Sequence, residues 1–240
     1  MLFRSDAFSA DLVQSLHNLS LSLRDVGKKK EALDVIQEAV NMRRDLATSG
    51  PEAFNACLAS SLQALNMSLC DVGKKGDALS AISEAVKIHR ELAAENPAAY
   101  NSHLADSLNR LACRLNETNQ MSEALVAIRE ALTIWKKLAN SASEAPYPNL
   151  AMSLFNQALF LKKGEQWAPA LGPIRECVEI RRRLAQRHPS SYSEKLRRSL
   201  WILEHCLQNL GRAEEAHKAK EEADKINTKP QGLPRATAVG

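Results

Sequence analysis

The sequence predicts an all-α fold, an α-solenoid of five antiparallel helix pairs, from three observations. A five-residue pattern, Leu-x-x-Ser-Leu, recurs at a constant interval of about 46 residues. Glycine recurs at a fixed place between the apolar stretches, and the composition, 45% hydrophobic with 5% aromatic residues, suits helices rich in Ala and Leu. A fixed period of this length is typical of stacked repeats in which each unit packs only on its neighbours. The pattern begins at Leu12, Leu58, Leu104, Leu150 and Leu196.

The first helix of each repeat, called the A helix below, carries this pattern. In the second unit Leu58, Leu62, Leu65 and Leu69 recur at steps of three and four residues, which places them on one helical stripe. Gly73 follows, and glycine ends a helix readily because it accepts positive φ without a steric penalty. The equivalent positions hold Gly27, Asn119, Glu165 and Gly211. Asparagine tolerates this conformation, so only the glutamate departs from the expected turn.

The second helix of each repeat, the B helix, follows the turn. In the second unit it carries Ala78, Ile82 and Ala85, and it should end near Asn96 because the residue before a proline avoids helical geometry. Small residues recur in the column of Ala85, which lets the two helices of a pair approach closely. This column holds Ala39, Ala85, Ala131, Cys177 and Ala223. In the fourth unit Pro173 removes a backbone donor, and we expect it to bend the B helix.

Charged residues also recur in columns on the B helices. Glutamates stand at Glu38, Glu84, Glu130 and Glu176, and cations stand at Arg44, Arg90, Lys136 and Arg182. Because they recur in every unit, these columns predict ion pairs between neighbouring repeats rather than a binding site.

The two ends of the chain differ from the interior. The last helix, from Arg212 to about Asn227, has Lys220 and Asp224 where other repeats have aliphatic residues, which predicts a polar cap. At the other end Leu12, Leu16 and Leu19 have no preceding helix to cover them, so we expect this face to dock on an upstream segment or on a second copy of the chain. The predicted organisation is a lead-in at 1–7, repeats at about 8–53, 54–99, 100–145, 146–191 and 192–227, and a disordered tail at 228–240.

These units resemble the tetratricopeptide repeat. The residues that carry the resemblance are an A-helix leucine, the turn glycine, and then Ala32, Ile36 and Ala39 on the B helix. The resemblance covers about residues 8–226, and each unit is about 12 residues longer than the standard 34. It is similar to the long repeats of kinesin light chains and of large bacterial and fungal multidomain proteins. The resemblance implies a right-handed superhelix whose A helices line a concave groove, and partners that bind in this groove.

Outward A-helix positions are the candidate site that this resemblance implies. The family's clamp for terminal carboxylates uses Lys and Asn, but the matching places here include His17, Gln63 and Met67, so a chaperone-tail receptor is not expected. An aromatic and cationic patch in repeats four and five is the preferred surface, and packing of its aromatic residues between repeats is the alternative. The candidate partner-binding residues are Phe155, Leu159, Lys162, Lys163, Arg198, Trp201, His205, Asn109 and Asn116.

No motif in the sequence indicates catalysis, a cofactor or a metal site. A phosphate-binding glycine loop, a His-Glu-x-x-His pair and a Gly-x-Ser-x-Gly elbow are all missing, and the six histidines lack ligand spacing. Five cysteines without a C-x-x-C pair and the lack of a leader-like or membrane-spanning apolar run fit a cytoplasmic protein.

The sequence therefore predicts a non-enzymatic scaffold that binds a protein or peptide, with acidic and apolar anchors as the expected partner chemistry. Two alternatives remain open at this point. One is a regulatory or sensor module of a larger multidomain protein that carries an NTPase or protease-like domain. The other is a weak RNA or anionic-ligand binder through the basic fourth and fifth repeats, although a net charge of only +4 does not favour nucleic acid.

Overall fold

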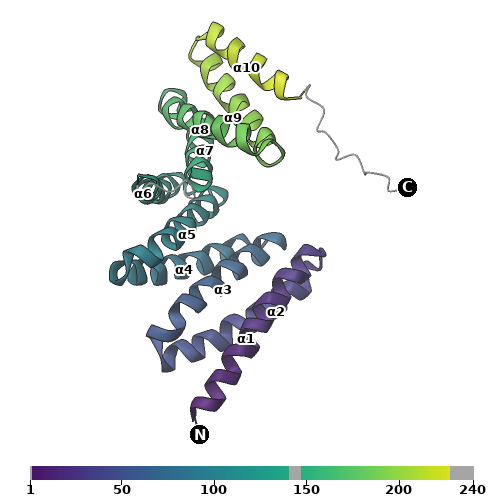
Figure 1. Ribbon diagram of the computed structural model, residues 1–240, viewed down its shortest axis with the longest axis vertical. Coiled ribbons are helices and arrows are strands. Elements are labelled where there is room, and N and C mark those ends of the chain that lie inside the picture. The colour runs from purple at the N-terminus through teal and green to yellow at the C-terminus, as the bar shows by residue number, and fades with distance from the viewer. Residues whose placement is uncertain (1, 141–146, 228–240) are drawn as a thin grey trace, which may run out of the picture. The chain divides into compact units, whose positions relative to one another are not determined.

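The computed structural model describes residues 2–140 and 147–227, and these residues form ten helices and no strand (Figure 1). The helices are α1 (Leu2–Asp25), α2 (Lys29–Ser49), α3 (Pro51–Asp71), α4 (Lys75–Glu95), α5 (Pro97–Glu117), α6 (Met121–Ala139), α7 (Tyr147–Lys163), α8 (Trp167–Arg187), α9 (Pro189–Asn209) and α10 (Ala213–Asn227). The odd-numbered helices are the A helices and the even-numbered ones are the B helices. The prediction of an all-α fold built from five helix pairs is confirmed.

The turn inside each pair adopts the same left-handed conformation. The φ angles are 79° at Gly27, 81° at Gly73, 61° at Asn119, 55° at Glu165 and 71° at Gly211. In the second repeat the N–H of Lys74, the residue after the glycine, donates to the carbonyl of Leu69 at 2.9 Å. This bond satisfies a carbonyl at the helix end. All five repeats therefore use one turn geometry, including the repeat that places a glutamate there.

Prolines mark the start of three A helices, α3, α5 and α9, which begin at Pro51, Pro97 and Pro189. Asn96 precedes one of these prolines with an extended backbone, φ −135°, and its side chain accepts a hydrogen bond from the N–H of Ala99 at 3.2 Å. The B helix α4 ends at Glu95, as the proline predicted. In the fourth repeat, α8 continues through Pro173 without a break.

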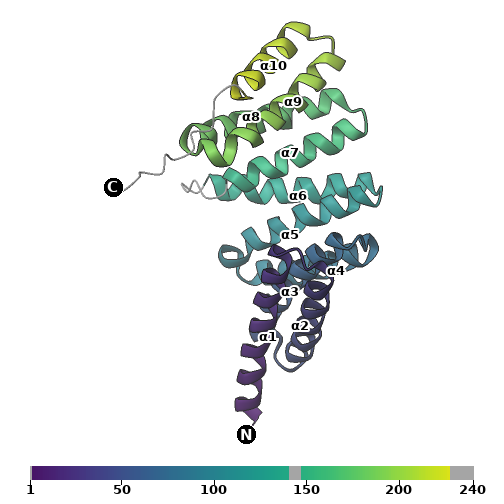
Figure 2. The same ribbon diagram turned by 90° about the vertical axis from the view of Figure 1, so that its right-hand side faces the viewer.

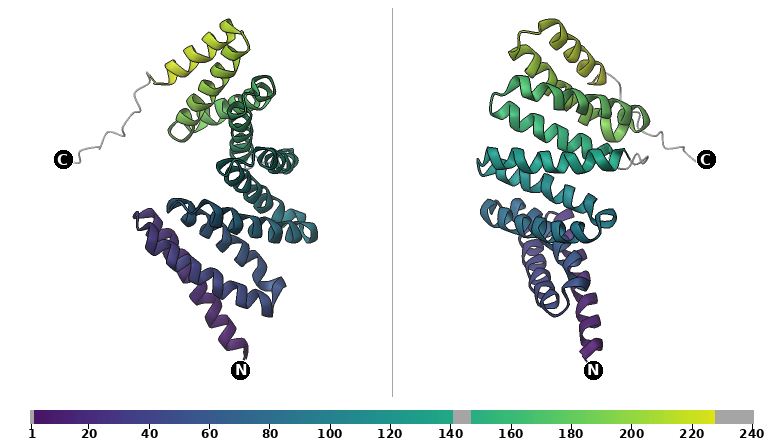
Figure 3. Two further views of the ribbon diagram at one scale, coloured as in Figure 1. Left: turned by 180° about the vertical axis from the view of Figure 1, so that it is seen from behind. Right: turned by 90° about the vertical axis from the view of Figure 1, so that its left-hand side faces the viewer.

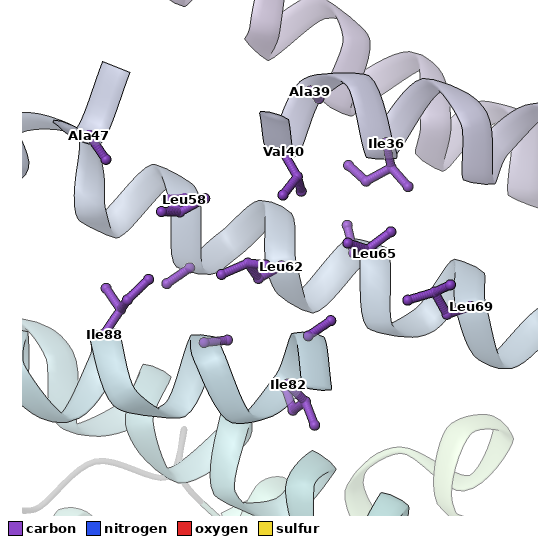
Figure 4. Close-up of a cluster of buried hydrophobic side chains, with 14 of the residues drawn as sticks. Ile36, Ala39, Val40, Ala47, Leu58, Leu62, Leu65, Leu69, Ile82 and Ile88 are labelled. Carbon is purple, nitrogen blue, oxygen red and sulfur yellow. The ribbon is translucent and has the colours of Figure 1, made fainter. Parts of the chain in front are cut away.

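The described residues form two compact units, 2–134 and 135–227 without 141–146. In the first unit α3 lies between α2 and α4. Figure 4 shows Leu62 and Leu65 of α3 facing Ile36 of α2 on one side, and Ile82 of α4 on the other. In the second unit α7, α8, α9 and α10 follow one another as antiparallel neighbours (Figures 2 and 3).

The serine of the Leu-x-x-Ser-Leu pattern is buried in the second to fifth repeats, and in three of them a side chain of the preceding B helix bonds to it. In the first compact unit Arg43 is 4% exposed, and its guanidinium donates to the Ser61 hydroxyl and to the Cys57 carbonyl, each at 2.6 Å. Its other nitrogen donates to the Gln14 side chain at 2.7 Å. In the second unit Arg181 repeats this arrangement with Ser199. We call this contact between a B helix and the next A helix the serine clasp.

The clasp changes chemistry along the chain. In the second repeat His89 takes the arginine position, and its Nδ1 lies 2.7 Å from the Ser107 hydroxyl. In the third repeat Trp135 takes this position, and both its indole N–H and the Ser153 hydroxyl are buried without a hydrogen-bond partner in the structure. One position of the repeat therefore holds two hydrogen-bonded arginines, one histidine and one tryptophan that makes no such bond.

A row of ion pairs joins successive B helices, as the charged columns predicted. The bonded atoms lie 2.5 Å apart in Arg44–Glu84, 3.0 Å in Arg90–Glu130, 2.8 Å in Lys136–Glu176 and 2.7 Å in Arg182–Glu222. All of these side chains remain at least one-third exposed. Each pair therefore contributes well under about 1 kcal/mol, and the row fixes the alignment of the helices more than it adds stability.

The ends of the described helices expose different surfaces. Lys220 and Asp224 lie on the exposed face of α10, where interior repeats bury aliphatic residues. At the other end Leu12 of α1 is 47% exposed, whereas Leu58, its equivalent in α3, is 5% exposed. The helix α1 already begins at Leu2, within the segment expected as a lead-in, and the tail expected to be disordered lies outside the described residues.

Candidate partner-binding surface

The nine candidate residues are distributed over both compact units. Asn109 and Asn116 lie on α5 in the first unit, where Asn109 is buried and both already make polar contacts within the chain. The other seven lie on α7 and α9 in the second unit. The surface on α7 and α9 therefore belongs to one compact unit, without Asn109 and Asn116.

Phe155 does not reach the surface of the second unit. Its ring is 9% exposed and lies beneath two guanidinium groups, with Arg181 at 4.5 Å and Arg198 at 5.7 Å from the ring centroid. Such cation–π contacts are stronger when they are shielded from water. Phe155 therefore packs between α7, α8 and α9, which corresponds to the packing alternative for this residue.

Trp201 is the exposed aromatic side chain of this surface, at 53% of its full area. Its indole ring stacks on His205 at 5.7 Å with an interplanar angle of 11°, and the Lys162 ammonium lies 4.9 Å from its centroid. His205 also contacts the Trp167 ring in an edge-to-face arrangement, with 5.6 Å between the ring centroids. We call Lys162, Trp167, Trp201 and His205 the Trp201 cluster.

The Trp201 cluster combines residues from three helices. Lys162 lies in the last turn of α7, Trp167 begins α8, and Trp201 and His205 lie one turn apart on α9. Leu159, 37% exposed on α7, adds to the apolar surface of the unit. Trp167 was not among the residues predicted from the sequence, although a large aromatic residue directly after the turn was the available signal.

The position of Trp201 in the repeat explains its exposure. In earlier repeats the residue at the position of Trp201 faces the next A helix. The His17 ring nitrogen lies 3.1 Å from the Ser61 hydroxyl, and the Gln63 amide donates to Ser107 at 2.6 Å. Phe155 occupies the same column. Among the described residues no A helix follows α9, so this column ends with an uncovered tryptophan.

Three cations near this surface have no carboxylate within ion-pair distance among the described residues: Lys162, Lys195 and Arg198. Each lies over an aromatic ring instead, and Lys195 is 4.7 Å from the centroid of Tyr192. The sequence of α7 contains no Asp or Glu. These three cations therefore contact aromatic rings, and ion pairs do not neutralise their charge.

Other cations of the basic region are already paired. Arg182 binds Glu222 and Glu179, and Arg197 binds Glu194 with two hydrogen bonds of 2.6 and 2.7 Å. These bonds to Arg197 lower the pKa of the Glu194 carboxyl. The positive charge that the sequence places between Lys162 and Arg198 is thus partly neutralised inside the chain.

The thiols in this unit lack the properties of nucleophiles. Burial raises the pKa of both Cys177 and Cys206, which keeps them protonated at neutral pH. In the ranges 2–140 and 147–227, no group of three His, Cys, Asp or Glu side chains is arranged to hold a metal ion. No helix in these ranges is both long enough and apolar enough to span a membrane.

The tetratricopeptide-repeat family model matches residues 12–47 and 104–144, and the model for anaphase-promoting complex subunit 5 matches residues 47–110 and 136–189. A search of curated proteins found no match.

Solved structures resemble the chain over nearly its whole length. One is a candidate kinesin light chain from Podosopora anserina with nearly identical TPR-like repeats, at 19% identity and a TM-score of 0.69, covering 92% of this chain and 97% of the other. BtubC (BKLC) from P. vanneervenii gives 17% identity and a TM-score of 0.65, covering 100% and 97%. MamA from Desulfovibrio magneticus RS-1 gives 13% identity and a TM-score of 0.62, covering 92% and 97%. At these identities the likeness concerns the fold alone.

Proposed function

Since this chain is a tetratricopeptide-repeat protein of the long-unit type seen in kinesin light chain-like structures, we propose that it is a non-catalytic scaffold that binds a segment of a partner protein on its A helices. Repeats of this fold generally mediate protein–protein interactions. The proposal places the contact on α7 and α9, around the Trp201 cluster.

The observation that carries the proposal is the exposed Trp201 ring in a column whose other members are covered by a neighbouring helix. A large exposed aromatic side chain flanked by cations is the composition of an interface anchor, since Trp and Arg dominate binding energy at protein interfaces. Lys162 and Arg198 add charge that a partner can neutralise. Asn109 and Asn116 have no part in this contact as proposed.

A chemical role is not part of the proposal. The cysteines described in the structure are free thiols, and those in the second unit have raised pKa values from burial. Free thiols are typical of a reducing compartment, and we expect the scaffold to work in the cytoplasm.

Affinity capture with the full chain tests the proposal. The variant carrying Trp201→Ala and Lys162→Glu removes the aromatic anchor and reverses one charge on exposed or half-exposed positions, so the fold should persist, which circular dichroism can check. The matched control carries Val126→Ala and Lys87→Glu, which are exposed positions of the first unit. We expect the variant to retain less than a tenth of the partners that wild type and control retain. Equal retention by all three proteins would place the binding surface elsewhere.

A further inference from the structure

Two turns of the first compact unit contain the same five residues. Asp-Val-Gly-Lys-Lys spans the turn between α1 and α2 at 25–29 and the turn between α3 and α4 at 71–75. The other three repeats build the same left-handed turn with different residues, so neither the valine nor the lysines are needed for its geometry. Exposed positions elsewhere in the first two repeats differ, as Gln14 does from Ser60 and Asp34 from Ser80.

The two turns lie side by side at one edge of the repeat stack. Arg24, just before the first turn, donates to the carboxylate of Asp71, which begins the second turn, with 2.7 Å between the bonded atoms. Lys74 and Lys75 are exposed although helices of both neighbouring repeats pack against α3 and α4. The exposure of this edge therefore follows from the geometry of the stack, whatever precedes or follows these repeats.

The lysines of the first unit are concentrated at this edge. Residues 1–134 contain six lysines, and five of them lie in or directly after the two turns: Lys28, Lys29, Lys30, Lys74 and Lys75. All five are exposed. Among the side chains that the structure describes, only Lys28 has a carboxylate within ion-pair distance, that of Glu31 at 3.1 Å, and both partners are more than half exposed. We call these five lysines together with Val26 the lysine edge.

The lysines contribute little to the stability of the turns. Lys29 and Lys75 are the first residues of α2 and α4, where the helix dipole favours acidic side chains over basic ones. The equivalent first residues of the later B helices are Met121, Trp167 and Ala213. The pair of Lys28 with Glu31 is too exposed to add much. Interaction with another molecule explains five clustered lysines better than folding does.

The lysine edge is a positive patch on an acidic unit. Residues 1–134 contain 14 lysines and arginines and 17 aspartates and glutamates, a net charge of −3. The segments 24–31 and 70–77 together contain six of these cations and four of these carboxylates, a net charge of +2, so the remainder of the unit carries −5. Most of the unit therefore repels an acidic partner, and this edge attracts it, which steers its approach.

A short acidic protein segment matches this edge better than a membrane or a nucleic acid does. Asp25, Glu31 and Asp77 lie among the lysines, so an extended array of phosphates would also meet these carboxylates and the acidic remainder of the unit. Neither turn contains an aromatic ring on which a base can stack. A protein segment, by contrast, can place carboxylates at the lysines alone. Val26, which is 70% exposed, offers such a segment an apolar contact.

The spacing of the turns indicates how far apart the carboxylates of the partner lie. Neighbouring helices pack about 8–10 Å apart, which sets the separation of the two groups of lysines. An extended chain covers about 10 Å in three residues. We therefore propose that the lysine edge binds an extended acidic segment of a partner protein. Carboxylates three residues apart bind the lysines of the two turns, and a small apolar side chain between them contacts Val26.

This surface is separate from the one on α7 and α9, and the inference does not rest on the proposed function. The variant with Trp201→Ala and Lys162→Glu should therefore bind an acidic segment at the lysine edge as tightly as wild type does. If that variant loses captured partners but keeps this binding, both surfaces stand. If captured partners persist in it, the proposed function fails and the lysine edge is unaffected.

Fluorescence anisotropy with the full chain tests the inference. The probe is a dye-labelled peptide of twelve residues in which two Glu-Glu pairs flank Val-Ser, with Gly and Ser at both ends. One matched peptide replaces every Glu by Lys, and a 20-nucleotide oligo(U) represents nucleic acid. We expect the acidic peptide to bind at least tenfold more tightly than either, with an affinity that falls as salt rises. Equal binding of the lysine peptide, or tighter binding of oligo(U), would contradict the inference.

Variants locate the binding surface. The test variant carries glutamine in place of Lys29, Lys30, Lys74 and Lys75, and it should bind the acidic peptide at least tenfold more weakly with an unchanged unfolding temperature. Arginine at the same four positions should preserve binding. A control of equal net charge carries glutamine in place of four other exposed lysines, Lys87, Lys137, Lys218 and Lys220, and should bind within twofold of wild type. Equal losses in the test variant and this control would show that net charge alone determines binding, and the lysine edge would be refuted.

The apolar contact has its own matched pair. Val26→Ser should weaken binding of the acidic peptide about threefold, whereas Val126→Ser, at a valine that is 62% exposed on α6, should not change it. Carbodiimide cross-linking of the bound peptide, mapped by mass spectrometry, should join its glutamates to the lysines of the two turns. Cross-links to Lys87 or to lysines of the second unit instead would overturn the inference.

Discussion

Ser61, Ser107, Ser153 and Ser199 occupy one position of the repeat, but their surroundings differ. Three of them form a hydrogen bond with a polar side chain of the preceding B helix. For Ser153 the equivalent residue of that helix is Trp135, and the serine has no hydrogen-bond partner. A buried hydroxyl stabilises the fold only when it is hydrogen-bonded. The same serine therefore has opposite energetic consequences in different repeats.

Alanine substitutions should reveal this difference within the second unit. Ser199→Ala removes one of the two acceptors of the buried Arg181 guanidinium and should destabilise the unit by about 1–2 kcal/mol. Ser153→Ala removes an unsatisfied hydroxyl and should be neutral or stabilising by up to about 1 kcal/mol. Urea unfolding followed by circular dichroism checks both, and equal losses of stability in the two variants would contradict the serine clasp.

The turn residue of the fourth repeat should be the easiest place to gain stability. Glu165 adopts φ 55°, where a side chain costs about 1–2 kcal/mol relative to glycine. Glu165→Gly should therefore raise the free energy of unfolding, because it relieves this strain. The gain should be only about 1 kcal/mol, because the greater freedom of glycine in the unfolded chain offsets part of it.

Gly211→Ala is the matched control for this prediction in the same unit. Gly211 has φ 71° and no atom within 4 Å of an added Cβ, so alanine there should cost about 1 kcal/mol through the backbone alone. Thermal unfolding checks both variants. A loss of stability in Glu165→Gly would show that the glutamate side chain makes a compensating contact.

His89 should make the first unit sensitive to mild acid. Burial lowers the pKa of this ring to about 4, and the nearby His103 adds to the shift. The folded state therefore favours the neutral ring, so its contribution is complete above the unfolded pKa of about 6.5 and is lost as the pH falls toward 4. Between pH 7 and pH 5 we expect a loss of about 1–2 kcal/mol from this residue.

Urea titrations at pH 7 and pH 5 measure this effect against a His89→Gln variant. Glutamine retains hydrogen-bonding capacity toward Ser107 but does not titrate. The loss of stability on acidification should be smaller in the variant than in wild type. If both proteins lose the same amount, the acid sensitivity arises from other groups, such as His17, whose pKa burial also lowers.

Phe155 and Trp201 show what sequence could not predict about the site. They occupy the same column, but one is buried and the other is exposed. Both were equally good candidates because exposure depends on whether another helix packs on that flank. The serine clasp could not be predicted from the sequence either. Its two partners stand 18 residues apart, and the B-helix position holds arginine, histidine or tryptophan in different repeats.

At the scale of helices the sequence was far more informative. The signals that begin and end helices are local: Pro97 set the start of α5, and Gly73 set the turn before α4. The ion pairs between B helices were also predictable, because each column repeats with the period of the fold. Pro173 was harder to interpret, since α8 accommodates it within a continuous helix.

The polar face of α10 should keep the end of the array in solution. Replacing Lys220 by Ile and Asp224 by Val restores the residue types that interior repeats bury at these positions. The altered face could then pack against exposed Leu12 and Leu19 of another copy, so we expect concentration-dependent association.

Sedimentation velocity measures this association. The control carries Glu214→Ile and Lys218→Val, which make the same kinds of change on exposed positions of the same helix. The control should sediment as wild type does. An unchanged sedimentation coefficient for the variant at Lys220 and Asp224 would show that these charges do not limit stacking.

At the scale of the whole chain, the repeat period runs through both compact units. The spacing of about 46 residues continues unchanged past the boundary between Ile134 and Trp135, so periodicity alone gave no sign of it. The boundary falls where the clasp column changes to tryptophan. Periodicity thus predicted the architecture but not the division into two units.

The serine clasp also bears on how such a chain can be cut and rejoined. A segment bounded by turn residues, such as 28–73, contains Arg43 and Ser61 together, whereas a segment bounded by prolines, such as 51–96, separates His89 from Ser107. Gene duplication or the grafting of repeats between proteins should therefore succeed best with junctions in the glycine turns. The portable module is a B helix with the A helix that follows it, one half-repeat out of phase with the hairpin that the sequence pattern suggests.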